Sequence, residues 1–417
     1  MIHRLRTLTP RSQIILIVAV TIGLRLVLAW IFGSEVADLT LYRRMADIVG
    51  RGENIYKPIT LFPYTPIAMF LPAWLSDLAQ ALSLPFHFVF KWLTILIDAG
   101  IALLLWWQAH KRQLPHNAAL WIGLAFALSP VDIIITSFHG SESILPIFFV
   151  LLAYYLVSFL PANRAYHIAA ISLGVAIGLR GFPVLFVPFF LRKINVDWRR
   201  KIVFLILAAI PAGITLLPYM VVDFPAVWRE VFSHSGFIDY GWVAAMRGFW
   251  FLTTSNLYLP GTLSEELLGF SKLLFLLAYA GFVTVFWRKS DRFSLLGGML
   301  GTTLLFFSVY GGISSQYLVW VIPFALLVGS RWVTVYTWSA TATLISFYLF
   351  YFPTILFGTL PIEWPTLNPA VMGFNLVFNT LFWGLCGTWF IRLLIRPTTD
   401  IALPPPNSAG KQSLKQV

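Results

Sequence analysis

Long apolar runs recur along nearly the whole chain and constrain its fold more than any other feature. Runs of roughly 17 to 25 residues cross a bilayer as α-helices, and lipid offers no partners for unpaired backbone groups inside them. The 417 residues are 59% hydrophobic and only 11% charged, whereas soluble domains carry about a quarter charged residues. The sequence therefore predicts an all-α integral membrane protein, a polytopic helical bundle without a sheet.

We expect about 10 to 12 transmembrane helices from these runs. Gly and Pro break the pattern around 179–183, which predicts an interrupted helix near the outer face. The stretch 66–82 contains two prolines and an aspartate, so we expect it to be re-entrant or interfacial. The predicted spans are 13–33, 87–109, 118–130, 143–160, 166–180, 182–191, 202–220, 268–287, 294–310, 316–330, 333–352 and 369–393.

The basic residues gather in short loops and in the tail, which can all be placed on one side of the membrane. Most of the 29 Lys and Arg lie there, with Asp197, Asp291 and Asp400 as the accompanying acids. The positive-inside rule then predicts an N-in, C-in protein with an even number of crossings. The net charge of +12 reflects this orientation, so no nucleic-acid partner is expected.

Three regions follow along the chain. Residues 1–12 form a cytoplasmic N-terminus before a first span that we expect to be retained, because no small-residue cleavage site follows it. Residues 13–396 form the transmembrane domain, with outward-facing segments at 34–86, 131–142, 221–267 and 353–368. Residues 397–417 are rich in Pro and Ser, and we expect a disordered cytoplasmic tail.

The first outer loop, 34–86, concentrates polar residues in an otherwise apolar chain. Asp38 stands at its head, about one helical turn past the first span. A carboxylate there is placed to act as a general base at the membrane surface, although an aspartate before helix-forming residues is also typical of an N-cap. Tyr56 and Tyr64 are candidates for lining a sugar site, with anchoring at the membrane interface as the alternative.

Two further polar positions interrupt apolar segments. His139 and Glu142 follow the third span, where ionisable residues are costly and indicate function. His139 is a candidate hydrogen-bond donor to a phosphate, and Glu142 is a candidate for binding sugar hydroxyls. Arg180 lies at the predicted helix break, where its guanidinium matches phosphate oxygens. Pairing of Arg180 with an acid such as Glu142 is the structural alternative.

The remaining candidates lie in later outer segments. His234 and Arg247 add a titratable ring and a cation to the long loop 221–267, while Gln316 and Tyr317 open a span where a helix N-terminus suits an anion. The sequence contains no P-loop, no dinucleotide-binding glycine pattern and no zinc-ligand spacing. We therefore expect no cofactor and no metal site, with a divalent metal not excluded.

Four blocks in this order resemble the integral-membrane glycosyltransferases of the C superfamily (GT-C). They are similar to the catalytic subunit of GPI mannosyltransferase I and to bacterial polyprenyl-phosphate-mannose mannosyltransferases. In that family an Asp-x-Asp pair lies in the first outer loop, whereas here Val36 takes the earlier position and only Asp38 matches. The blocks are ADLTLYRRMADIVGRGENIYKPITLFPYTP, SPVDIIITSFHGSESI, LRGFPVLFVPFFL and SSQYLVWVIPF.

The resemblance implies an inverting glycosyltransferase, most simply an α-mannosyltransferase, with Asp38 as its base. A polyprenyl-phosphate sugar would be the donor and a glycolipid or glycan the acceptor, with transfer on the outer face. Arg180, His139, and Arg247 or His234 would bind the leaving phosphate. A small membrane partner subunit is compatible with this interpretation.

Two other function classes stay open. A transporter or flippase predicts inverted repeats and ionisable residues at mid-membrane, and a non-catalytic subunit of a glycosylation complex would tolerate loss of Asp38. The tail without a dilysine retrieval signal, together with a single cysteine, Cys386, favours a bacterial plasma membrane with the active site on its periplasmic face.

Overall fold

The computed structural model describes residues 8–32, 37–57, 63–114, 117–358 and 360–397. Within these ranges the chain is helical, and its only β-type pairing is the isolated antiparallel bridge between Tyr240 and Ile313. The prediction of an all-helical protein is therefore confirmed for the described residues. The predicted disordered tail lies almost wholly outside them.

The bounds of the helices are as follows. In chain order they are α2 (Pro10–Ile31), α3 (Ala37–Gly50), α4 (Pro66–Ala81), α5 (Phe86–Lys111), α6 (Ala118–Ala127), α7 (Pro130–Ile133), η1 (Ile134–His139), η2 (Glu142–Ile144), α8 (Leu145–Phe159), α9 (Ala162–Leu179), η3 (Phe182–Phe186), α10 (Val187–Lys193), α11 (Trp198–Val227), η4 (Trp228–Phe232), α12 (Trp242–Thr254), α13 (Leu263–Arg288), α14 (Leu295–Val309), η5 (Ser315–Trp320), α15 (Val321–Val328), α16 (Trp332–Tyr351), α17 (Pro353–Phe357) and α18 (Pro369–Ile395).

Among the described residues, eight helical segments are long and apolar enough to cross a membrane. Shorter apolar helices cover Ala165–Leu179, Leu295–Val309 and Ser315–Val328. These features are those of a polytopic helical membrane protein. The number of crossings and the orientation stay predictions, because length and composition do not fix them.

The segments predicted to face outward differ most from expectation. The segment 131–142, predicted to face outward, is mostly helical: α6, α7 and the π-helix η1 form one apolar segment, Ala118–His139. Pro130 opens α7, where its missing N–H costs nothing, and Gly140 ends η1 in the left-handed conformation, with φ of 80°. Polar side chains in this stretch face protein partners, which a hydropathy pattern does not reveal.

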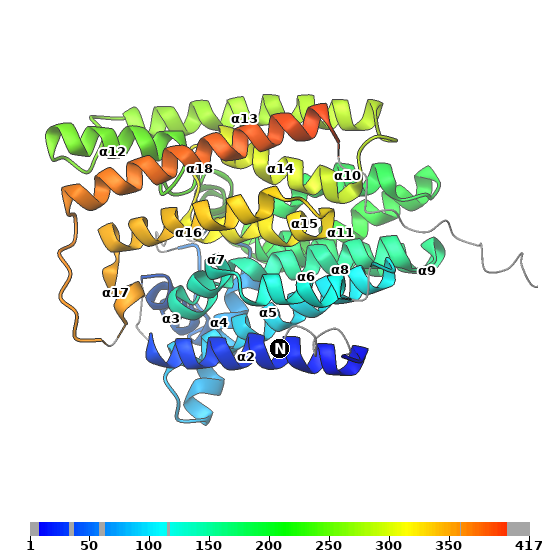
Figure 1. Cartoon of the computed structure of the whole chain (residues 1–417), viewed down its shortest axis with the longest axis horizontal. Helices are drawn as coiled ribbons and strands as arrows, with labels where there is room; N and C mark the ends of the chain where they lie inside the picture. The colour runs from blue at the N-terminus through cyan, green and yellow to red at the C-terminus, as the bar shows by residue number, and fades with distance from the viewer. Residues whose placement is uncertain (1–7, 33–36, 58–62, 115–116, 359, 398–417) are drawn as a thin grey trace, which may run out of the picture.

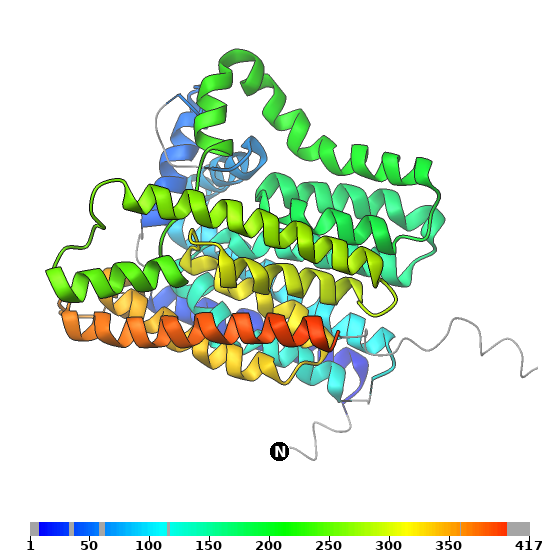
Figure 2. The same cartoon turned by 90° about the horizontal axis from the view of Figure 1, so that it is seen from above.

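The other long outer segments are also largely helical. The stretch 34–86 contains α3 and α4, and 221–267 contains the end of α11, η4 and α12. A kink at Asp223, with φ of −153°, changes the direction of α11 before η4 (Figure 2). The break predicted around 179–183 is confirmed, because α9 ends at Leu179 and a 3-10 turn begins at Phe182.

Most helices run roughly parallel to one another (Figure 1). The core sits around α14 and α15, whose residues are almost all buried. In α11 and α13, by contrast, large apolar side chains such as Ile214, Val221 and Leu277 are exposed, as expected of helices that face lipid. The start of α2 and the end of α18 lie at one end of the bundle, whereas α3 and α17 lie at the opposite end (Figure 1).

Candidate functional site

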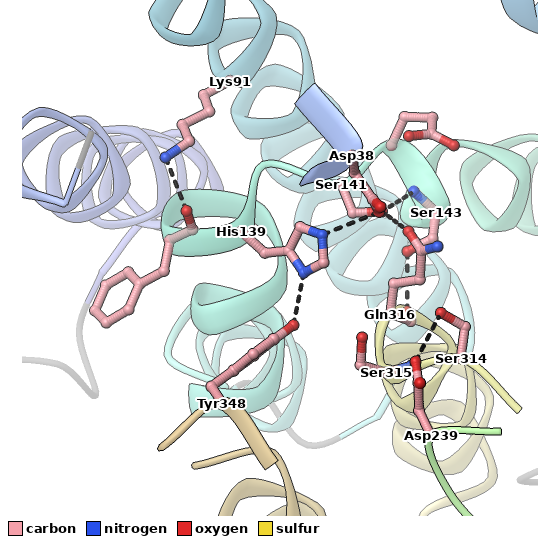
Figure 3. A network of polar contacts seen from close by, with 12 residues as sticks. Asp38, Lys91, His139, Ser141, Ser143, Asp239, Ser314, Ser315, Gln316 and Tyr348 are labelled. Atoms are coloured by element: carbon pink, nitrogen blue, oxygen red, sulfur yellow. Dashed lines mark hydrogen bonds and ion pairs between the residues drawn. The ribbon is translucent and has the colours of Figure 1, made fainter. Parts of the chain in front are cut away.

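The site is built around a short chain of hydrogen bonds from Asp38 through His139 to Tyr348 (Figure 3). His139 Nε2 lies 3.0 Å from Asp38 Oδ2, and its Nδ1 lies 2.6 Å from the Tyr348 hydroxyl. Nε2–H can donate to the carboxylate, and which group donates between Nδ1 and the Tyr348 hydroxyl depends on which ring nitrogens carry a proton. Asp38 Oδ1 has no hydrogen-bond partner among the described residues, and the side chain is 32% exposed. This oxygen is free to accept a proton.

The surroundings keep Asp38 ionised. Burial acts to raise the pKa of Asp38, but the charge of His139, its hydrogen bond and the charge of Arg180 together hold that pKa below the ordinary value. Asp38 lies in the first turn of α3, where the helix dipole also favours an anion. The carboxylate therefore carries its charge at neutral pH, as a proton acceptor requires.

Arg180 and Glu142 form the second half of the site. Arg180 Nη2 donates to Glu142 Oε1 at 2.8 Å, and both side chains are buried. The rings of Tyr64 and Tyr317 lie 4.7 and 5.1 Å from the guanidinium carbon, which is a cation–π distance. The predicted alternative of an Arg180–Glu142 pair is thus present.

Polar atoms of this pair are left without hydrogen-bond partners among the described residues. They are Nε and Nη1 of Arg180 and Oε2 of Glu142, all buried. Such unsatisfied buried groups are rare and costly in proteins. Gln316 lies beside them, because its Oε1 accepts from Arg180 Nη2 at 3.4 Å and from the Ser141 hydroxyl.

A cavity of about 340 Å³ opens directly from Arg180. One part of its wall is polar, with Arg180, His234 and Lys272, and the rest is mainly apolar and aromatic, with Phe275 and Phe306. Burial and the nearby charge of Lys272 lower the pKa of His234, against the opposing effect of Glu230. Lys272 is therefore the main positive charge on this wall besides Arg180.

Two broken helices place these side chains. The π-helix η1 and the left-handed Gly140 turn the chain sharply, so that His139 and Glu142 flank a single turn. Beyond α9, Arg180 adopts an extended backbone, with φ of −150°, before Gly181 and Pro183 start a 3-10 turn. His139, Glu142 and Arg180 thus lie where a regular helix is interrupted, whereas Asp38 lies in the first turn of α3.

The other predicted residues take different places. The Tyr56 hydroxyl donates to the Tyr64 carbonyl at 2.8 Å, so Tyr56 braces the segment that carries Tyr64 and lies away from the cavity. His234 lines the cavity with Tyr64 and Tyr317, whereas Arg247 stacks on Tyr351, 5.2 Å from the ring centre. His139 uses both ring nitrogens on Asp38 and Tyr348, so a direct phosphate contact from its ring would require losing one of them.

Sequence reasoning missed several residues near the site. Tyr348 sits in an aromatic-rich span and carries no distinguishing signal. Asp239 caps η5, accepting from Ser315 N–H at 3.1 Å, and burial raises its pKa to about 6 despite the charge of Arg247. Lys272 could have been found, because a lysine inside an apolar run is unusual.

A buried ion cluster below the site was also missed. Arg25 Nε donates to Asp98 at 2.9 Å and its Nη2 to Asp132 at 2.5 Å, all fully buried. The cluster joins α2, α5 and α7, and the Thr136 hydroxyl donates to the Asp132 carbonyl at 2.9 Å. Ionisable residues inside predicted spans were the available signal for it.

No group of three or more His, Cys, Asp or Glu side chains gathers as a metal site within the described ranges. No protein-family model matches this sequence, and no curated protein matches it significantly. The geometry of the site therefore carries the functional conclusion.

Proposed function

We propose that this protein is a membrane-embedded glycosyltransferase that moves a sugar from a polyprenyl-phosphate donor to an acceptor hydroxyl, with Asp38 as the general base. Mannose is the proposed sugar, and a glycolipid or glycan the proposed acceptor, on the outer face of a bacterial plasma membrane. Membership of the C superfamily is part of this proposal and rests on the four sequence blocks.

One observation carries the proposal. The carboxylate of Asp38 lies close enough to Arg180 for that positive charge to lower its pKa; Arg180 has buried N–H groups without partners among the described residues, and a largely apolar cavity opens from it. A base, an anion-binding group and an apolar chamber are what transfer from a lipid-linked phosphate needs.

Charge balance favours a phosphate in the cavity. Glu142 neutralises Arg180 within the protein, so Lys272, which has no ion pair among the described residues, supplies excess positive charge. A donor phosphodiester carries one negative charge, and the released lipid phosphate carries nearly two. Preorganised cations stabilise this developing charge in the transition state.

The proposed reaction is a single displacement. The acceptor O–H proton passes to Asp38 Oδ1 while the acceptor oxygen forms a bond to the anomeric carbon. The bond from that carbon to the phosphate oxygen breaks, and the electron pair leaves with the lipid phosphate toward Arg180 and Lys272. One base suffices, by analogy with inverting hydrolysis, and the anomeric configuration inverts.

The cavity wall suits a prenyl chain. Phe232 and Leu276 line it and are 44% and 48% exposed on the outside of the bundle. These residues lie on η4 and α13, two helices with exposed apolar faces. A lipid tail held there extends into the bilayer without crossing the protein.

The buried cluster of Arg25, Asp98 and Asp132 helps to decide between an enzyme and a transporter. Ionisable groups at mid-span are expected in transporters, and Asp98 lies near the middle of α5. The three side chains are fully buried, however, and each carboxylate is used by the arginine. The cluster therefore fits a structural tie between helices better than a transport path.

The direct test uses the purified chain alone in liposomes with radiolabelled polyprenyl-phosphate mannose and a lipid acceptor, with and without EDTA. We expect transfer in both conditions and an inverted anomeric configuration in the product. Loss of transfer in EDTA would add a metal to the mechanism. Absence of transfer from mannose, glucose and pentose donors alike would contradict the enzyme and favour a non-catalytic subunit.

A further inference from the structure

Lys91 is a fully buried cation close to the site that the mechanism above does not use. It lies on α5, and its ammonium donates to two backbone carbonyls, that of Phe138 at 2.8 Å and that of Phe32 at 3.2 Å. Figure 3 shows one of these two contacts. No ion pair involves Lys91 among the described residues.

One carbonyl belongs to η1, which carries His139, and the other ends α2, the helix that precedes the α3 of Asp38 in the chain. Phe138 directly precedes His139 at the end of η1, and Phe32 caps α2, six residues before Asp38. The rings of Phe32 and Phe138 stack with centroids 4.2 Å apart. The Lys91 ammonium thus joins the end of α2 to the end of η1, next to His139.

The alkyl chain of Lys91 also fixes the turn after His139. A Cβ on Gly140 would lie 3.0 Å from Lys91 Cε and 3.2 Å from Leu39 Cδ1. Leu39 directly follows Asp38, so Lys91, the His139–Gly140 turn and the start of α3 pack against one another. Gly140 is required here both by its positive φ and by this crowding.

Burying an ammonium is costly, and an apolar side chain would fill the same space more cheaply. The C-terminal end of α2 partly offsets this cost, because a cation is favourable beside helix C-terminal carbonyls. A charge retained at such a cost, bonded to both segments, has a more specific use than filling space.

We propose that Lys91 is a positioning residue that holds Asp38 and His139 in register for proton transfer. This inference rests on the proposed function, since it assigns Lys91 to the geometry of the proposed base. Lys91 acts only through the two segments and has no contact with substrate.

The test replaces Lys91 with methionine, which keeps chain length and loses the N–H donors. We expect kcat for sugar transfer to fall about tenfold or more, in line with the sensitivity of catalysis to small misplacements, while KM for the donor stays within about twofold. Thr94→Val is the matched control: Thr94 is buried one turn along α5, and its hydroxyl bonds the carbonyls of Lys91 and Thr136. The control should keep kcat near the wild-type value.

A double-mutant cycle separates positioning from general support of the fold. If Lys91 acts through His139, adding Lys91→Met to His139→Gln lowers kcat no further, because contacting residues couple whereas independent sites add. Additive losses, or a kcat for Lys91→Met equal to the wild type, would overturn the inference.

The same double-mutant cycle, with the unfolding midpoint in detergent as the readout, separates failure of the Lys91 proposal from failure of the proposed glycosyltransferase function. If the wild type transfers no sugar, the proposed function fails, yet Lys91→Met and His139→Gln should still shift the unfolding midpoint non-additively. Thr94→Val and His139→Gln should be additive. Additive shifts for both pairs would overturn the role of Lys91 whatever the chain catalyses.

Discussion

At the scale of single residues, the candidate site depends on His139, whose two ring nitrogens contact Asp38 and Tyr348. Asp38, His139, Glu142 and Arg180 stand out in the sequence because each is ionisable in an apolar setting. Their pairing could not be read from it, since residues more than a hundred positions apart, such as Asp38 and His139, meet only in the fold. The sequence predicted that His139 binds a phosphate; in the structure its two ring nitrogens contact Asp38 and Tyr348.

The pH dependence of transfer tests this pairing. His139 and Arg180 hold the pKa of Asp38 below its ordinary value, so the base stays ionised, and kcat/KM is retained, until pH falls through that lowered pKa. In His139→Gln the contacts that lower the pKa of Asp38 are lost, so burial raises that pKa. The acid limb of the profile should then shift to higher pH by about one unit or more. A pH profile of kcat/KM measures the shift. An unchanged acid limb would show that Asp38 is not the base, or that its contact with His139 does not affect catalysis.

At the scale of elements, His139, Glu142 and Arg180 lie where a regular helix is interrupted. Pro and Gly around 179–183 predicted the break that presents Arg180. The π-helix η1 was not predicted, because an apolar run followed by His139-Gly140 also fits a helix end and a loop. The cavity between η4 and α13 depends on the bend of α11 at Asp223, which hydropathy does not encode.

Lys272 on α13 provides a test of the cavity. Lys272→Met removes positive charge that faces the proposed phosphate and leaves the base untouched, so KM for the lipid donor should rise about tenfold with a smaller change in kcat. Lys289→Met, at the exposed end of the same helix, is the control and should behave as wild type. Initial rates over a range of donor concentrations give KM for each variant. Equal KM values for Lys272→Met and the wild type would show that the donor phosphate does not bind in this cavity.

The Arg25 cluster makes a prediction about stability. Arg25→Met leaves Asp98 and Asp132 facing each other in a buried site, and breaking a buried pair in this way costs about 3–5 kcal/mol. We expect a clearly lower unfolding temperature in detergent. Replacing all three by Met, Asn and Asn should recover much of the loss, because no charge is then left unpaired; a single variant as stable as wild type would show that the cluster does not tie the helices.

At the scale of the whole molecule, hydropathy predicted the all-helical fold, since the described part of each predicted apolar run is largely helical. The packing order, with α14 and α15 at the centre and α11 and α13 outside, depends on side-chain contacts that composition does not specify. The start of α2 and the end of α18 lie at one end and α3 at the other (Figure 1). This arrangement agrees with termini on the same side of a membrane.

Cysteine labelling tests the orientation. Cys386 is buried in α18, so Cys386→Ser gives a background without thiols. In intact cells, Glu53→Cys should react with a membrane-impermeant maleimide, because Glu53 is exposed just beyond α3. Lys289→Cys should react only after permeabilisation. The reverse pattern would put the site on the cytoplasmic face.

The central claim is that Asp38 is the base, and the most direct measurement compares kcat for Asp38→Asn with kcat for Asp47→Asn. Asp47 lies on the same helix and is exposed, so its amide variant controls for the loss of a charge on α3. The account predicts a fall of about 10²-fold or more for Asp38→Asn, in the range of general-base catalysis, with Asp47→Asn near the wild type. Equal kcat for both variants would contradict it.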